Sequence, residues 1–180
     1  MQLLDSPTRY GTVSRFFHWS IGALIIWQIL SMVAKNTLGR ESALAAFMAG
    51  SHASVGFVIF LLVWLRVVWA IINRGRRPVH GDGLLGLAAR AGHLVMYLLM
   101  LLIPTVAVLR AFGGERSFAV FGIQLSGGRP EGQEIEALTG LANLHGEMGW
   151  LLAVLILGHV GMAVFHSVVL KDRTIAKMAA

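Results

Sequence analysis

The sequence predicts an all-α integral membrane protein, a four-helix bundle in which a single domain takes up residues 1–180. Hydrophobic residues make up 56% of the chain and charged residues only 13%, with a mean hydropathy of +0.71. A soluble domain of this length carries far more charge. Four apolar stretches each reach the roughly 20 residues that cross a bilayer.

The four predicted helices follow these apolar stretches, at about residues 16–34, 51–72, 91–112 and 144–170. A segment in lipid must satisfy its backbone hydrogen bonds internally, so each stretch should be helical. Pro104 should kink the third helix or remove one of its hydrogen bonds. The N-terminus lacks the pattern of a cleaved signal peptide, so we expect the first stretch to be a retained span.

The basic residues predict that both termini face the cytoplasm, because Lys and Arg are in excess on that side. The two termini and the second connection carry Arg9, Arg15, Arg74, Arg76, Arg77, Arg90, Lys171, Arg173 and Lys177. The opposite side carries Lys35, Arg40, Arg110, Arg116 and Arg129, together with Glu41, Glu115, Glu131, Glu134 and Glu136. The net charge of +6 therefore reflects membrane orientation, and nucleic-acid binding is not expected.

The longest loop, at about residues 113–143, should then face outward. Its stretch FAVFGIQL, residues 118–125, is apolar enough to lie in the membrane interface as a lid over the helix ends.

Six of the seven histidines fall at two depths of the predicted bundle; His80, in a polar loop, is expected at the surface. His52 begins a helix that enters the membrane from outside, and so does His145. His159 follows His145 by fourteen residues, about 21 Å along a helix and on nearly the same face. One helix thus presents an imidazole near each side of the membrane.

The remaining histidines lie toward the cytoplasmic side. His18 and His93 begin helices that enter from the cytoplasm, and His166 follows His159 by seven residues. A single histidine in a span can be explained by a hydrogen bond to a neighbouring helix. Five or six histidines at two matched depths require another explanation.

Three chemistries compete for these histidines. A proton relay would use acidic residues in the spans, where only Glu147, near the outer end, is present. Zinc or copper sites usually take three or four ligands, and each depth offers about two. Two imidazoles on facing helices suit an iron whose other four ligands come from a porphyrin. Since the chain has no cysteine, the expected cofactors are two non-covalent b haems.

The favoured axial pairs are His52 with His145 at the outer haem iron and His18 with His159 at the inner haem iron. The inner pair stays open, because His93 and His166 lie near the same depth.

Two arginines are candidates to neutralise haem propionates. Arg66 is a charge inside the cytoplasmic half of the second span, and Arg15 lies at the start of the first. The alternative for Arg15 is snorkelling to the membrane interface. Glycines near the histidines would let a flat macrocycle approach the helices, although ordinary small-residue packing explains them equally well.

Several motifs together resemble the bacterial cytochrome b561 family over residues Tyr10 to about Lys177. They are SRFFHW, SHASVG, LAARAGHLVMYLLMLLIP, FAVFG and LHGEMGWLLAVLILGHVGMAVFHSVVLKD. The resemblance is greatest to the diheme members that act as superoxide oxidases.

The resemblance implies a multi-pass protein of the bacterial inner membrane that passes electrons from periplasmic superoxide through two haems to ubiquinone. It implies the same two axial pairs, with His166 and, as a second candidate, His93 as partners of the quinone. No residue is assigned a catalytic role. The alternatives are an electron-transfer subunit that links the quinone pool to a periplasmic redox partner, and a bundle without a cofactor.

Overall fold

The computed structural model describes residues 2–39, 41–78, 83–172 and 174–179, so that Arg40, His80 and Arg173 lie outside the described residues. The long helices are α1 (Thr12–Leu38), α2 (Ala43–Ile72), α3 (Gly83–Gly113) and α5 (Ala142–Phe165). Four helical segments are long and apolar enough to cross a membrane, which confirms the four predicted spans.

The helices extend beyond the predicted spans, most clearly at the starts of α2 and α3. Ser42 caps α2 by accepting a hydrogen bond from the Ala45 backbone N–H at 3.4 Å. The apolar run marks only the part of a helix inside the hydrocarbon, and the backbone stays helical into the interface. Pro104 lies inside α3 without ending it.

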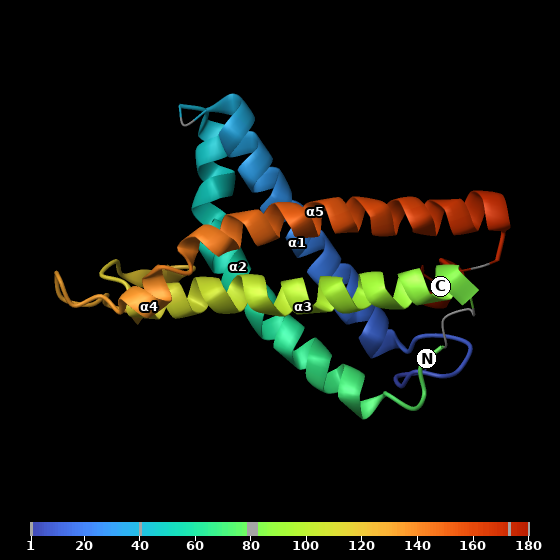
Figure 1. Ribbon diagram of the computed structural model, residues 1–180. Helices are drawn as coiled ribbons and strands as arrows, with labels where there is room; N and C mark the ends of the chain where they lie inside the picture. The colour runs from blue at the N-terminus through green and yellow to red at the C-terminus, as the bar shows by residue number, and fades with distance from the viewer. Residues whose placement is uncertain (1, 40, 79–82, 173, 180) are drawn as a thin grey trace.

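The helices form two pairs that cross one another (Figure 1). Helices α1 and α2 are packed as an antiparallel pair, as are α3 and α5. The buried core where the pairs meet draws on every long helix, with Ile21 from α1, Val63 from α2, Met96 from α3 and Leu152 from α5. Many large apolar side chains point outward instead, as a lipid-facing surface requires.

Both termini lie at one end of the molecule, which we call the terminal end (Figure 1). The Tyr10 backbone N–H donates to the Lys177 carbonyl at 3.2 Å. Trp19 Nε1 donates to the carbonyl of Met178, in the short helix α6 (Ala176–Ala179), at 3.1 Å. This placement agrees with the prediction that the two termini share one side of the membrane.

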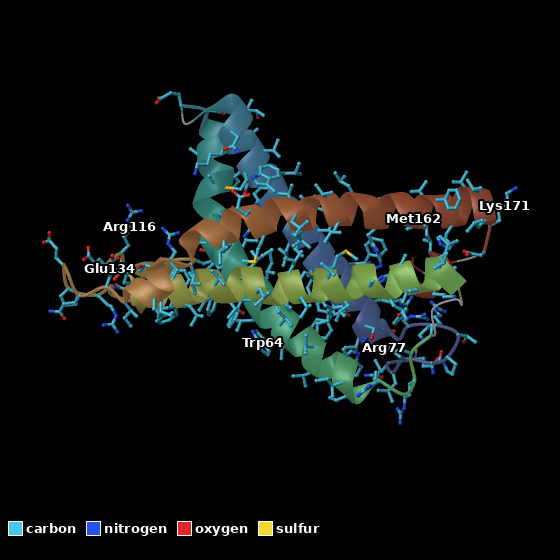
Figure 2. The ribbon with its side chains drawn as sticks, in the orientation of Figure 1. Trp64, Arg77, Arg116, Glu134, Met162 and Lys171 are labelled. Atoms are coloured by element: carbon cyan, nitrogen blue, oxygen red, sulfur yellow. The ribbon has the colours of Figure 1, made fainter. Side chains whose placement is uncertain are left out.

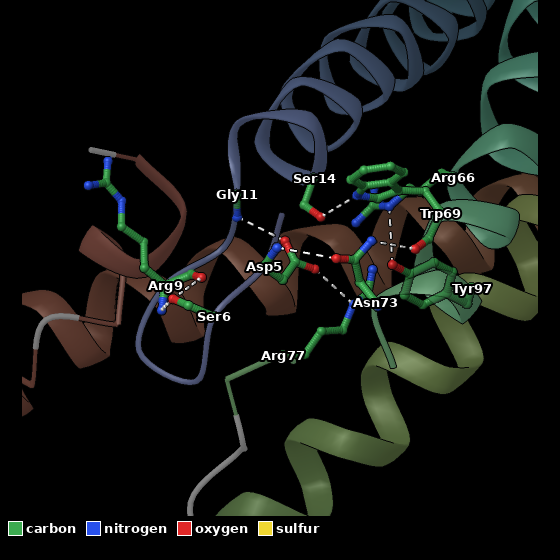
Figure 3. A network of polar contacts seen from close by, with 10 residues as sticks. All are labelled: Asp5, Ser6, Arg9, Gly11, Ser14, Arg66, Trp69, Asn73, Arg77 and Tyr97. Atoms are coloured by element: carbon green, nitrogen blue, oxygen red, sulfur yellow. Dashed lines mark hydrogen bonds and ion pairs between the residues drawn. The ribbon is translucent and has the colours of Figure 1, made fainter. Parts of the chain in front are cut away.

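A network of buried polar groups fastens the N-terminal segment to the end of α2 (Figure 3). The fully buried side chain of Asp5 accepts hydrogen bonds from the Gly11 backbone N–H at 2.8 Å and from Arg77 Nε at 3.2 Å. The Asp5 backbone N–H donates to Asn73 Oδ1 at 3.2 Å. Tyr10 lies next to this network, and burial raises its pKa.

The opposite end, which we call the hairpin end, carries strands β1 (Phe118–Val120) and β2 (Ile123–Ser126), followed by the short helix α4 (Glu136–Thr139). Positive φ angles at Phe121 (47°) and Gly122 (86°) form the two-residue turn that joins the antiparallel strands. The Phe121 backbone N–H donates to Ser54 Oγ on α2 at 3.0 Å. The stretch expected as an apolar lid is therefore a hairpin held against α2.

The predicted fourth helix is divided in two. After Phe165 the backbone continues as a π-helical turn, η1 (His166–Leu170), and Lys171 ends it in the left-handed region with φ of 53°. Apolar spacing cannot distinguish an α-helix from a π-helical turn, so this change could not be predicted from the sequence. π-Helical turns are found frequently at functional sites.

Candidate haem sites

At the hairpin end, α2 and α5 bring His52 and His145 together. Their ring centroids are 6.0 Å apart and the rings are inclined by 74°. Two in-line imidazole–metal bonds of about 2 Å each, with the ring half-widths added, give a centroid separation of about 6 Å. The spacing therefore fits one iron between the two rings.

Hydrogen bonds fix which nitrogen of each ring is available. His145 Nδ1 lies 3.0 Å from the carbonyl oxygen of Ile103, which can only accept, so Nδ1 carries the proton. His52 Nδ1 lies 3.3 Å from Ser31 Oγ. The Ser31 hydroxyl donates its only proton to the Gln28 carbonyl at 2.7 Å, so it accepts from His52. Both rings thus keep Nε2 for a metal, the usual arrangement around histidine ligands.

At the terminal end, three histidines gather from α1, α3 and α5. The ring centroids of His18 and His159 are 6.2 Å apart, and those of His93 and His159 are 5.2 Å apart. Only the first separation leaves room for two metal bonds of about 2 Å each. His93 Nδ1 donates to the Ala89 carbonyl of its own helix at 2.6 Å. The geometry thus supports His18 with His159, the predicted inner pair.

Glycines leave open space beside the histidines. Gly22 follows His18 by one helical turn, and Gly149 follows His145 by one turn, so each glycine lies on the same face as its histidine. A Cβ atom added to either glycine would meet nothing within 4 Å. A flat macrocycle can lie against such a helix face.

The donor set does not suit a bare metal ion. Within the described parts of the chain, no group of three or more His, Asp or Glu side chains is placed to hold one. Zinc and copper sites usually need at least three protein ligands. Paired imidazoles with open space around them fit a porphyrin iron instead.

The two candidate propionate partners lie toward the terminal end. Arg66, half-buried on α2, donates from Nε to the Tyr97 hydroxyl at 3.1 Å. Arg15 donates from Nη2 to Thr12 Oγ1 at 3.4 Å in the first turn of α1. The sequence did not single out Tyr97.

Asp172 is a second residue that the sequence did not single out. Its Oδ2 lies 2.5 Å from His166 Nδ1, while its Oδ1 accepts from the Thr174 backbone N–H and hydroxyl. These hydrogen bonds, those from Thr174 first, lower the pKa of Asp172 to about 2. A carboxylate thus orients the imidazole of His166 at the start of η1.

A shallow cavity of about 310 Å³ lies at the hairpin end between α1 and α2. Its lining includes Lys35, which follows Ser31 by one helical turn, and Ala49, which precedes His52 by three residues. Lys35 therefore lies on the His52 side of the His52–His145 pair. The other charges at this end are mixed, with exposed Arg116 and Glu134 both extending from the loops (Figure 2).

An apolar four-helix protein with imidazole pairs at haem-binding spacing, and no cysteine for covalent attachment, falls in the class of b-type membrane cytochromes. Within that class the chain belongs to the prokaryotic cytochrome b561 family, whose profile matches residues 9–179. The family binds b haem and transfers electrons across the bacterial inner membrane, where this chain is a multi-pass protein.

Two curated relatives span almost the same length. Cytochrome b561 homolog 2 of Escherichia coli (strain K12) is 28% identical over 99% of this chain and 95% of its own. Cytochrome b561 homolog 1 of the same organism is 24% identical over 94% of this chain and 96% of its own.

Proposed function

We propose that the protein holds two b haems and is a superoxide:ubiquinone oxidoreductase. In this proposal the hairpin end faces the periplasm and receives electrons from superoxide, and the terminal end faces the cytoplasm and delivers them to ubiquinone. The observation that carries the proposal is the presence of one imidazole pair toward each end, His52 with His145 and His18 with His159.

Each pair would supply the two axial ligands of one iron. Held by two imidazoles, such a haem would supply single-electron exchange and would leave no position for a substrate to bind the metal. Superoxide and ubiquinone would therefore exchange electrons with the haem from nearby, without binding the metal. Arg66 and Arg15 would pair with propionates at the terminal end, where Arg66 is already tethered to Tyr97.

The Lys35 cavity would admit the anionic donor. Superoxide carries one negative charge, and a lysine in a recess walled by alanine and glycine attracts it to a place on the His52 side of the His52–His145 pair. Each superoxide gives up one electron and leaves as dioxygen, so no bond to the protein is made or broken.

His166 would hold the quinone headgroup. Its Nδ1–H donates to Asp172, so Nε2 of the neutral ring would accept from the quinol hydroxyl, and Nε2–H of the imidazolium would donate to a quinone oxygen. His93 is the second candidate for this contact. Reduction of one ubiquinone to ubiquinol takes two electrons from two superoxide anions and two protons from the cytoplasmic side.

Two measurements test the proposal. Pyridine haemochrome quantitation of the purified protein should give two b haems per chain, and a value below one contradicts any redox function. A superoxide pulse should then reduce the haems rapidly, and added ubiquinone should reoxidise them. Reduction by quinol or a partner protein without a response to superoxide would favour the electron-transfer subunit.

A further inference from the structure

We propose that Tyr97 is a positioning residue that holds the Arg66 guanidinium beside the His18–His159 pair, where its positive charge raises the reduction potential of the haem at the terminal end. This inference rests on the proposed diheme function. It assigns to Arg66 and Tyr97 the task of drawing electrons from the hairpin end toward the terminal end.

The helix registers place Arg66 at the right depth. Arg66 follows His52 on α2 by fourteen residues, and His159 follows His145 on α5 by the same number. Helix α2 begins at the α1–α2 turn and α5 begins beside α4, and both helices end toward the side of the molecule that holds the termini (Figure 1). Fourteen residues advance a helix by about 21 Å and return to nearly the same face. Helix α2 therefore contributes the His52 imidazole at the level of the His52–His145 pair and the Arg66 guanidinium at the level of His159.

Two contacts attach Arg66 to Tyr97. Its Nε donates to the Tyr97 hydroxyl at 3.1 Å, and its Cζ lies 5.1 Å from the centre of the Tyr97 ring (Figure 3). Tyr97 follows His93 by one turn of α3, and the His93 ring is 5.2 Å from that of His159. The tyrosine thus connects the arginine to the cluster of histidines at the terminal end.

An arginine in a span needs such an attachment. Its long side chain otherwise extends toward the water at the nearest end of the helix, because a charge in hydrocarbon is unfavourable. Held at this depth, a positive charge in a medium of low dielectric constant favours a neighbouring group that gains an electron. The hydrogen-bond partners at the other pair are the uncharged Ser31 hydroxyl and Ile103 carbonyl. The positive charge nearest to that pair, Lys35, is exposed, so water and salt screen it more strongly than the half-buried Arg66. The two sites therefore differ in electrostatics while sharing the same ligand type.

The test is a potentiometric titration of the holoprotein, followed by visible absorbance, that resolves the two haems. Arg66→Gln should lower the potential of the terminal-end haem by at least about 59 mV, a tenfold change in a one-electron equilibrium. Tyr97→Phe, which keeps the ring and loses the acceptor, should produce part of this shift. The double variant Arg66→Gln/Tyr97→Phe should show the same potential as Arg66→Gln alone, because Tyr97 acts through Arg66.

Three further variants separate position from charge. Arg66→Lys keeps the charge and should retain more of the wild-type potential than Arg66→Gln. Tyr97→Gln supplies a side-chain oxygen that can accept from Arg66 Nε, and should restore most of the potential even if Tyr97→Phe assembles poorly. Tyr10→Phe removes a phenol hydroxyl from another half-buried tyrosine, which lies near Arg66 and Tyr97 but is not the acceptor of Arg66 Nε, and should shift the potential by less than Tyr97→Phe.

The inference is overturned if Tyr97→Phe and Tyr97→Gln both keep the wild-type potential, or if Tyr97→Phe shifts it equally in the Arg66→Gln background. A shift from Tyr10→Phe as large as that from Tyr97→Phe would also overturn it. A wild-type protein with fewer than two haems would contradict the proposed function itself. Haem quantitation of the wild type therefore distinguishes failure of the proposed function from failure of this inference.

Discussion

Replacing Ser31 with alanine should selectively weaken the haem at the hairpin end. Ser31 has no exposed surface, and its hydroxyl is the acceptor for His52 Nδ1. Removing it leaves the part-buried imidazole N–H of His52 without this partner, and a donor left unsatisfied away from water typically costs about 1–3 kcal/mol. Since 1.4 kcal/mol is a factor of ten, the expected loss of haem affinity is about 5- to 150-fold. This range overlaps the 10- to 100-fold typical of losing a hydrogen-bond partner of a metal ligand.

The assay is titration of haem into the apoprotein in detergent, with each site followed by its absorbance in the reduced state. Ser51→Ala is the matched control. Ser51 lies in the same α1–α2 interface, donates to the Met48 carbonyl at 2.7 Å and accepts from Trp27 Nε1 at 2.9 Å. It therefore has the same chemistry as Ser31 without a histidine partner.

Ser31→Ala should reduce affinity at the hairpin-end site alone, and Ser51→Ala should leave both sites unchanged. The reasoning is refuted if Ser31→Ala binds both haems as tightly as the wild type, or if Ser51→Ala weakens the same site equally. Either result would mean that the hydrogen bond to His52 Nδ1 does not hold the ligand.

Other predictions concern single sites. His145→Ala should lose the hairpin-end haem spectrum and keep the other. His166→Ala should keep both spectra and slow reoxidation by ubiquinone; loss of a haem would show that the terminal-end pair is assigned wrongly. Lys35→Gln should slow haem reduction by superoxide at low salt by more than at high salt, as stopped-flow measurements at two ionic strengths would show. The pKa of Asp172 is lowered from 3.8 to about 2, so its contribution to the C-terminal turn should be complete above pH 3.8 and lost as the pH falls through 2, measured by hydrogen exchange at the Thr174 amide.

The spacing of apolar residues was sufficient to predict the four spans, because the length of a membrane helix is set by the bilayer. Helical periodicity similarly predicted that His145 and His159 would lie on one face of the same helix. Spacing could not decide between His18 and His93 as the partner of His159, since both begin helices at the same depth. The ring separations of 6.2 and 5.2 Å favour His18, because only the larger one leaves room for two metal bonds, and the pair stays a prediction.

The residues that sequence reasoning missed depend on contacts between distant segments. Asp5 is fully buried because it meets Arg77 at the end of α2, 72 residues later in the chain. Tyr97 matters through Arg66, which lies 31 residues earlier on another helix. Asp172 is the exception, since it lies six residues after His166 and the intervening turn is local. A carboxylate just past a histidine at the end of a span is a signal that could have found it.

In the proposed diheme protein both irons have the same ligand type on helices of one bundle, so ligand chemistry alone would give electrons no preferred direction. A difference between the sites must come from the groups around them. At the hairpin end the imidazoles donate to a hydroxyl and a carbonyl, both uncharged. At the terminal end a guanidinium is held within the span by a tyrosine. If these groups set the direction of electron transfer, changing them while keeping all four histidines should change the order of the two haem reduction potentials. Replacing one of the histidines should only remove a haem.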